Sequence, residues 1–201
     1  MSGLVDKLTD EIKSQLTWTL DVRELEKNSY SCQSHSRYKY HMILIPKDKT
    51  DIFYDLNVLH EHVHAFYNEN LPEVFVYFDD TFANTFSDSR GLAKMCLDII
   101  NDWFVAGWLI QHCPSEYKNQ IDHCYKQVKE EYRDDIDDGQ LLTTALSLAE
   151  AIKWLHCPAC GDTRLIRVCN KLLRVSPKRP TVHKKRDLLE GLAKKFGLTI
   201  L

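Results

Sequence analysis

Two histidines and a glutamate near residue 60 have the spacing of a metal site. The segment His60-Glu61-His62-Val63-His64 lies in a stretch without Pro or Gly, which is predicted to be helical. At about 100° per residue, His60 and His64 share one face of that helix, one turn apart, where two imidazoles can bind one zinc ion. Glu61 can act as general base toward a water on the metal, because zinc lowers the pKa of that water. The motif predicts one catalytic Zn²⁺.

Two acids lie in a second predicted helix, over about residues 89–110, which is apolar on most of its sides. Asp98 and Asp102 are one turn apart in it. Burying either carboxylate would cost several kcal/mol unless it is paired or bound to metal. Metal ligation would remove this cost for Asp98, and a hydrogen bond to His60 or His64 would remove it for Asp102.

Together these residues resemble the zincin superfamily, and more narrowly the small gluzincin-like metallopeptidases. The motifs that carry the resemblance are His60-Glu61-x-x-His64 and Asp98-x-x-x-Asp102, and it covers about residues 38–110. The extended metzincin pattern does not fit, because Tyr67 and Asn70 stand where it needs Gly and His.

The resemblance implies a zincin-like core, in which a small sheet packs on the helix of the first motif and a second buried helix brings the third ligand. It implies that Asp98 is the third metal ligand and that Asp102 orients one of the two histidines through a hydrogen bond. Asp98 stands where the family usually has Glu, so Asp102 as the ligand is the alternative.

A second cysteine-based site is suggested by Cys157-Pro-Ala-Cys160-Gly161, which has the spacing of a zinc-knuckle turn. A structural metal ion would need two further ligands, and no second Cys-x-x-Cys exists in the chain. Cys157 and Cys160 are therefore a half-site for a structural zinc ion, a redox-active thiol pair, or inert reduced cysteines.

The remaining pattern predicts an α+β, mostly helical fold. The best strand is Tyr38–Ile45, which Pro46 ends, and Val74–Phe78 is a second candidate strand. Apolar periodicity predicts further helices at residues 3–15, 51–68, 115–133, 140–156, 163–173 and 185–196. We expect a zincin-like domain over residues 1–155 and a basic extension over 156–201 that docks on it.

Composition limits the class of protein. The 201 residues are 44% apolar and 27% charged, as in an ordinary globular chain, and no apolar run is long enough to cross a bilayer. Seven cysteines, an odd number, favour a reducing cytoplasm. Residues 162–201 hold eleven Lys and Arg against three acids, a net charge of +8, which leaves −11 for the rest of a chain whose total is −3. This basic segment either docks on the acidic body or contacts nucleic acid, and docking is favoured.

The sequence thus predicts a cytoplasmic zinc metallopeptidase that hydrolyses peptide or protein substrates, with Glu61 as the base. The alternative is a metal-binding, non-catalytic regulatory or interaction module of zincin-like fold. In that case its basic C-terminal segment would contact nucleic acid or a protein partner. No membrane association is expected.

Overall fold

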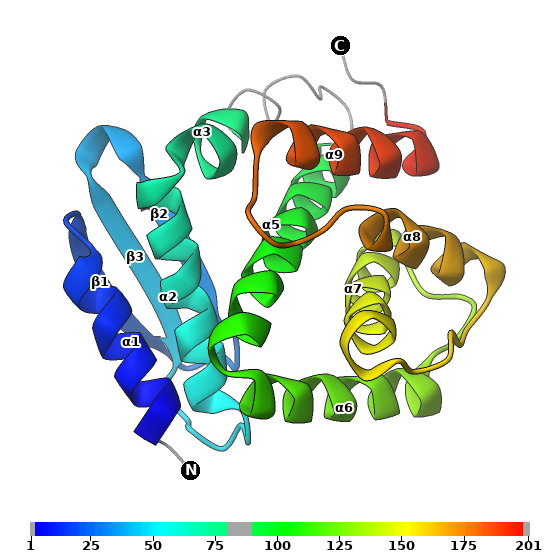
Figure 1. Cartoon of the computed structure of the whole chain (residues 1–201), viewed down its shortest axis with the longest axis horizontal. Coiled ribbons are helices and arrows are strands. Elements are labelled where there is room, and N and C mark those ends of the chain that lie inside the picture. Colours follow the sequence, from blue (N-terminus) through cyan, green and yellow to red (C-terminus); the bar gives the residue numbers. More distant parts are fainter. Residues whose placement is uncertain (1–2, 80–89, 199–201) are drawn as a thin grey trace. The chain divides into compact units, whose positions relative to one another are not determined.

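The computed structural model describes residues 3–79 and 90–198, which form a mostly helical α+β protein (Figure 1). Eight α-helices and one mixed three-stranded sheet lie within these residues, so the predicted fold class is confirmed. The chain divides into two compact units, Met1–Phe78 and Asp79–Leu201. The boundary predicted after residue 155 falls inside the second unit, and a separate extension there stays a prediction.

The sheet lies in the first unit and has the order β1-β3-β2. The central strand, β3 (Tyr40–Pro46), is the strand that the sequence predicted. It pairs in parallel with β1 (Thr19–Leu25) and antiparallel with β2 (Ser31–His35). Neither edge strand was predicted, because both are mostly polar and lack the apolar alternation that marks a strand with one buried face.

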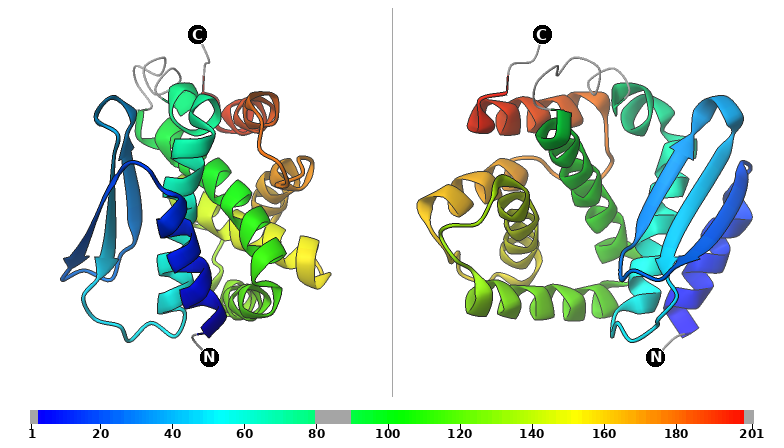
Figure 2. Two further views of the ribbon diagram at one scale, coloured as in Figure 1. Left: turned by 60° about the vertical axis from the view of Figure 1, so that its left-hand side comes forward. Right: turned by 180° about the vertical axis from the view of Figure 1, so that it is seen from behind.

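Two helices, α1 (Gly3–Gln15) and α2 (Tyr54–Asn70), lie on one face of this sheet (Figure 2). Alternate residues of β3, among them Ile43 and Ile45, are buried and pack with Ala65 of α2. The period of two in a strand puts these side chains on one face, and the helical period of α2 puts Leu59 and Val63 on its buried side. The helix predicted over residues 51–68 is therefore confirmed, and the sheet fixes its orientation.

The second candidate strand, Val74–Phe78, is wrong. Pro72–Phe75 form a short helix, α3, and Val74, Phe75 and Val76 are buried. A short apolar run does not by itself distinguish a strand from a buried helical turn, and Pro72 stands at the first helical position, where its fixed φ suits a helix.

Five helices make up the described part of the second unit. They are α5 (Arg90–His112), α6 (Pro114–Glu131), α7 (Asp138–Leu155), α8 (Thr163–Leu173) and α9 (Val182–Phe196). All five correspond to predicted helices, although Ser89, where the first of them was expected to begin, lies outside the described residues. Helix α5 contacts α6, α7 and α9, which explains why it is apolar on so many sides.

The linker between α8 and α9 is held against α5. The indole nitrogen of Trp103 donates a hydrogen bond to the Val175 carbonyl at 3.0 Å. A Cβ at Gly107 would lie 2.7 Å from the Pro177 carbonyl oxygen, so only glycine allows this approach. None of the described helices has both the length and the apolar character that crossing a bilayer requires.

Candidate metal centre

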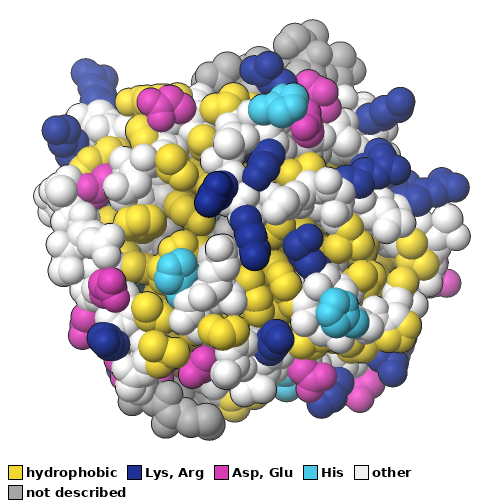
Figure 3. Space-filling model, viewed as in Figure 1, with side chains coloured by type: hydrophobic (Ala, Val, Ile, Leu, Met, Phe, Trp, Pro, Cys, Tyr) yellow, Lys and Arg dark blue, Asp and Glu magenta, His cyan; other side chains and the backbone are white. Residues whose placement is uncertain are grey.

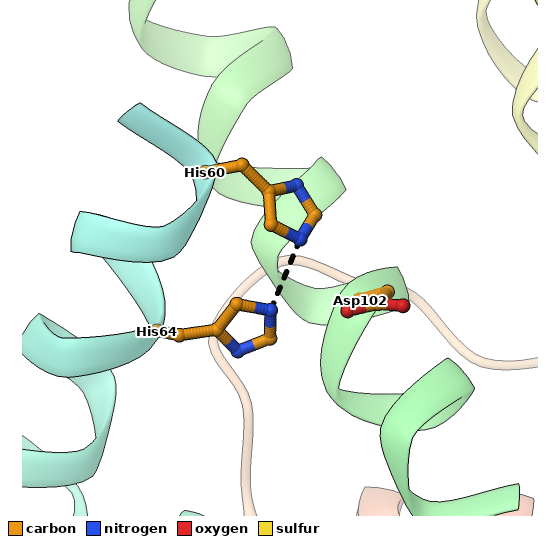
Figure 4. A group of neighbouring side chains, drawn as sticks. All are labelled: His60, His64 and Asp102. Atoms are coloured by element: carbon orange, nitrogen blue, oxygen red, sulfur yellow. Dashed lines mark hydrogen bonds between the residues drawn. The ribbon is translucent and has the colours of Figure 1, made fainter. Parts of the chain in front are cut away.

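His60 and His64 form a close pair on α2. Their Nε2 atoms are 3.0 Å apart and their ring centroids 4.8 Å, and both residues are half-buried (Figure 4). The helix produces this arrangement by itself, because residues four apart lie one turn above another on the same face. Two nitrogens that bind one tetrahedral zinc ion at 2.0–2.1 Å are about 3.3 Å apart, so the pair is already close to the spacing that ligation needs.

Glu61 is buried, with an exposed fraction of 8%. It lies near Cys32 of β2, since burial and then the Glu61 carboxylate raise the pKa of the Cys32 thiol to about 12. Glu61 therefore points about a quarter of a helical turn away from the histidine pair, toward the sheet. Its predicted role as general base stays a prediction.

His62 stands on another face of α2. It is 1% exposed, and its Nδ1 lies 2.7 Å from the Val58 carbonyl, which can only accept, so Nδ1 is the donor. Burial lowers the pKa of His62. The charge of Lys13 on α1 also lowers this pKa, and the charge of Asp10 on α1 raises it. His62 is therefore a core histidine at the contact between α1 and α2, as its position about 200° from His60 suggests.

The two acids of α5 differ in their surroundings. Asp98 is exposed and accepts a hydrogen bond from Lys94, one turn earlier, at 2.7 Å. Asp102 is half-buried and stands directly before the fully buried Trp103 and Phe104. The desolvation argument that singled out both acids therefore applies to Asp102 and not to Asp98. Metal ligation by Asp98 stays a prediction.

Cys157 and Cys160 follow α7 and are half-buried free thiols. Burial raises the pKa of both, which makes them poor nucleophiles at neutral pH in the absence of metal. Cys169 of α8 is close enough to Cys160 for the two to interact electrostatically. A structural metal ion at Cys157 and Cys160 stays a prediction.

The basic segment is apolar on the side that packs within the second unit. Six of its leucine and valine side chains are at most 1% exposed: Leu165, Val168, Leu172, Leu188, Leu189 and Leu192. Exposed basic side chains remain outside, at Arg167, Arg174, Lys178, Arg179, Arg186 and Lys194. Figure 3 shows Lys and Arg side chains at several places on the face that it draws. Packing of α8 and α9 thus leaves most of the charge of the segment in solvent.

One polar cluster was missed by sequence reasoning. Ser34 of β2, His41 of β3 and Glu69 of α2 are joined by hydrogen bonds in the first unit. They stand 7 and 28 positions apart in the chain, in three different elements, and match no short motif. One signal was present in the sequence. His41, Ile43 and Ile45 are every second residue of the predicted strand, which places all three side chains on the same, buried face.

Comparisons with protein-family models, with curated proteins and with solved structures find no match for this chain.

Proposed function

We propose that this protein binds one zinc ion through His60 and His64, with a carboxylate of α5 as the third ligand. The observation that carries the proposal is the 3.0 Å separation of the two Nε2 atoms, brought about by their spacing on α2. The carboxylates of Asp98 and Asp102 are the two candidates for the third ligand that the sequence pattern of α5 offers.

Asp102 is the preferred carboxylate. The Asp98 carboxylate is exposed and ion-paired with Lys94, so ligation by Asp98 would have to break that pair. Two imidazoles and one carboxylate are a donor set that suits zinc and leaves a coordination position open. This open position distinguishes a catalytic metal site from a structural one, which uses four protein ligands.

Hydrolysis of peptide bonds is the finer proposal. A zinc ion here would supply Lewis acidity, polarising a carbonyl and lowering the pKa of a water. Glu61 would accept the proton of the attacking water and pass it to the leaving amine. The substrate would be a peptide or protein, and the support for this step is the adjacency of Glu61 to His60 in the sequence.

A non-catalytic metal-binding module is the second candidate. It is favoured by the position of Glu61, which is buried and lies near Cys32 of the sheet. In that case the metal would stabilise the fold or a bound partner, and Glu61 would be a buried polar group of the core. Its basic C-terminal segment would then contact nucleic acid or a partner protein.

Metal content tests the shared part of both candidates. Untagged protein, stripped with chelator and titrated with Zn²⁺, should bind one ion, and the ion should raise the melting temperature. His60→Ala and His64→Ala should each lose this ion and its stabilisation. His183→Ala is the control, since this histidine is 84% exposed on α9. Equal zinc stoichiometry in all variants would contradict the proposal.

A further inference from the structure

Ser34, His41 and Glu69 form a continuous hydrogen-bonded chain apart from the histidine pair. Ser34 Oγ lies 2.7 Å from His41 Nδ1, and His41 Nε2 lies 3.2 Å from Glu69 Oε2. The first two residues are directly opposite each other in the antiparallel pair of β2 and β3. Their side chains therefore point to the same face of the sheet, toward the last turn of α2, where Glu69 stands.

The charges of these groups fix the direction of each hydrogen bond. Burial acts to raise the pKa of Glu69, but hydrogen bonds from Thr17, Trp18 and His41 outweigh it and hold the pKa below its ordinary value. An ionised carboxylate only accepts, so His41 donates from Nε2. Burial lowers the pKa of His41, so the ring is neutral near pH 7 and Nδ1 carries a lone pair. Ser34 must then donate its hydroxyl proton to Nδ1.

The surrounding residues hold this geometry. The ring of His41 is fully buried and stacks on Trp18, with centroids 4.9 Å apart and an angle of 14° between the planes. Thr17 donates to Glu69 Oε1 from its backbone nitrogen at 2.7 Å and also from its hydroxyl. The base and the carboxylate that orients it are therefore positioned before any ligand binds, which is what general-base catalysis requires.

Ser34 itself is half-buried, unlike His41. The side-chain nitrogen of Asn68 donates to Ser34 Oγ at 2.8 Å, which places an N–H donor next to the hydroxyl oxygen. A serine with a neutral histidine as acceptor, a carboxylate behind that histidine and an amide donor beside it has the parts of an activated nucleophile.

We propose that Ser34 is the nucleophile of a second, metal-independent site that accepts acyl groups from esters, with His41 as its general base and Glu69 as a positioning residue. Ser34 Oγ attacks the ester carbonyl carbon while its proton passes to His41 Nδ1. The C–O bond to the leaving alcohol breaks, and His41 returns the proton to that oxygen. Water then attacks the acyl-serine, gives a proton to His41, and releases the acid as Ser34 regains its hydrogen.

The substrate class follows from access. His41 is closed to solvent and Ser34 is half-buried, so an acyl group would reach the pair through Ser34. Within the described part of the chain, Glu69 is the one charged side chain that forms a hydrogen bond with Ser34 or His41. Because no further charge would pair with a charged substrate, an uncharged acyl ester is favoured. Peptide bonds are worse substrates for such a site, because an amine is a poorer leaving group than an alcohol.

A fluorophosphonate probe tests the nucleophile directly, since an activated serine displaces its fluoride and gains a stable phosphonyl mass. We expect intact wild-type protein to be labelled once, at Ser34, and to hydrolyse p-nitrophenyl acetate. Ser34→Ala should lose both. Ser36→Ala is the matched control, a half-buried serine two residues away, and should keep both. Chelator should leave labelling unchanged, which separates this site from the metal proposal.

Glu69→Gln distinguishes positioning from a structural role. Labelling in the wild type should increase with pH as His41 loses its proton. Without the carboxylate the pKa of His41 falls further, so the increase should move to lower pH while the plateau rate drops about 10-fold or more. Labelling that is absent in the wild type, located elsewhere than Ser34, or equal in Ser34→Ala overturns the proposal. An unshifted pH profile in a folded Glu69→Gln protein overturns the role of Glu69.

Discussion

The ammonium of Lys185 lies 2.5 Å from a carboxylate oxygen of Asp79, and the lysine is completely buried. Asn101 donates to the other Asp79 oxygen at 3.0 Å. Burial lowers the pKa of Lys185 and raises that of Asp79, so each ion depends on the other to remain charged. This pair connects α9 to the first residue of the second unit.

Removing one partner of the Lys185–Asp79 pair should lower the stability of the fold more than removing both partners does. Lys185→Met leaves the half-buried Asp79 carboxylate without its ion partner, and we expect it to lower the free energy of unfolding by about 3 kcal/mol. The double variant with Asp79→Asn should recover part of that loss. Urea unfolding measures both, with Lys194→Met, on the exposed side of α9, as the control that should change stability by less than about 0.5 kcal/mol. Equal loss in the single and double variants would contradict the coupling.

The choice between the two acids of α5 can be made by zinc affinity. Asp102→Asn should weaken zinc binding by about 10-fold or more, because a neutral amide is a poor zinc ligand. Asp98→Asn removes only the surface pair with Lys94 and should leave affinity unchanged. Isothermal titration with Zn²⁺ measures both, and the reverse pattern would restore Asp98, the ligand implied by the family resemblance.

Glu61→Gln separates metal binding from hydrolysis. The amide fills the same space but cannot take a proton, so zinc should remain at one ion per chain while peptide hydrolysis falls by about 10²–10⁴-fold. The measurement is turnover of a casein or peptide-library substrate, with zinc content determined on the same samples. Wild-type turnover in this variant would show that Glu61 is not the base.

Acid stability should report on Glu69. Its pKa is lower in the folded chain than the value of about 4.3 in an unfolded one, so its contribution to stability is present above that value. This contribution should be lost as pH falls through the folded pKa. Glu69→Gln should be about 2 kcal/mol or more less stable at pH 7 and should converge on the wild type in acid. Glu73→Gln, an exposed change in α3, is the control whose difference from the wild type should not vary in this way.

The basic segment should be part of the folded unit. Deleting residues 162–201 removes six leucine and valine side chains that are almost fully buried, a loss of at least about 5 kcal/mol, comparable to the whole stability of a small domain. We expect the truncated chain to lose its cooperative thermal transition. Full-length protein should bind duplex DNA weakly even at low salt, and tight binding with a steep salt dependence would instead support the nucleic-acid partner.

Local periodicity determined most of the helices and one strand of this protein. Helix α2 carries apolar residues at helical spacing with no Pro or Gly, and β3 alternates buried and half-buried side chains, so each could be predicted from its own residues. The His60–His64 pair is equally local, because one helical turn brings the two rings together. The polar edge strands and the turn at Pro72 could not be predicted in this way, since β1 and β2 are strands only because β3 pairs with them.

Contacts between distant segments were decided by the tertiary structure alone. The two acids of α5 have the same chemistry in the sequence, and only packing leaves Asp98 exposed while half-burying Asp102. Ser34, His41 and Glu69 come together because strand pairing and the position of α2 place three separate elements side by side. The periodicity of apolar residues indicates which face of a helix or strand is buried. Which other element packs on that face depends on the free energy of the whole fold.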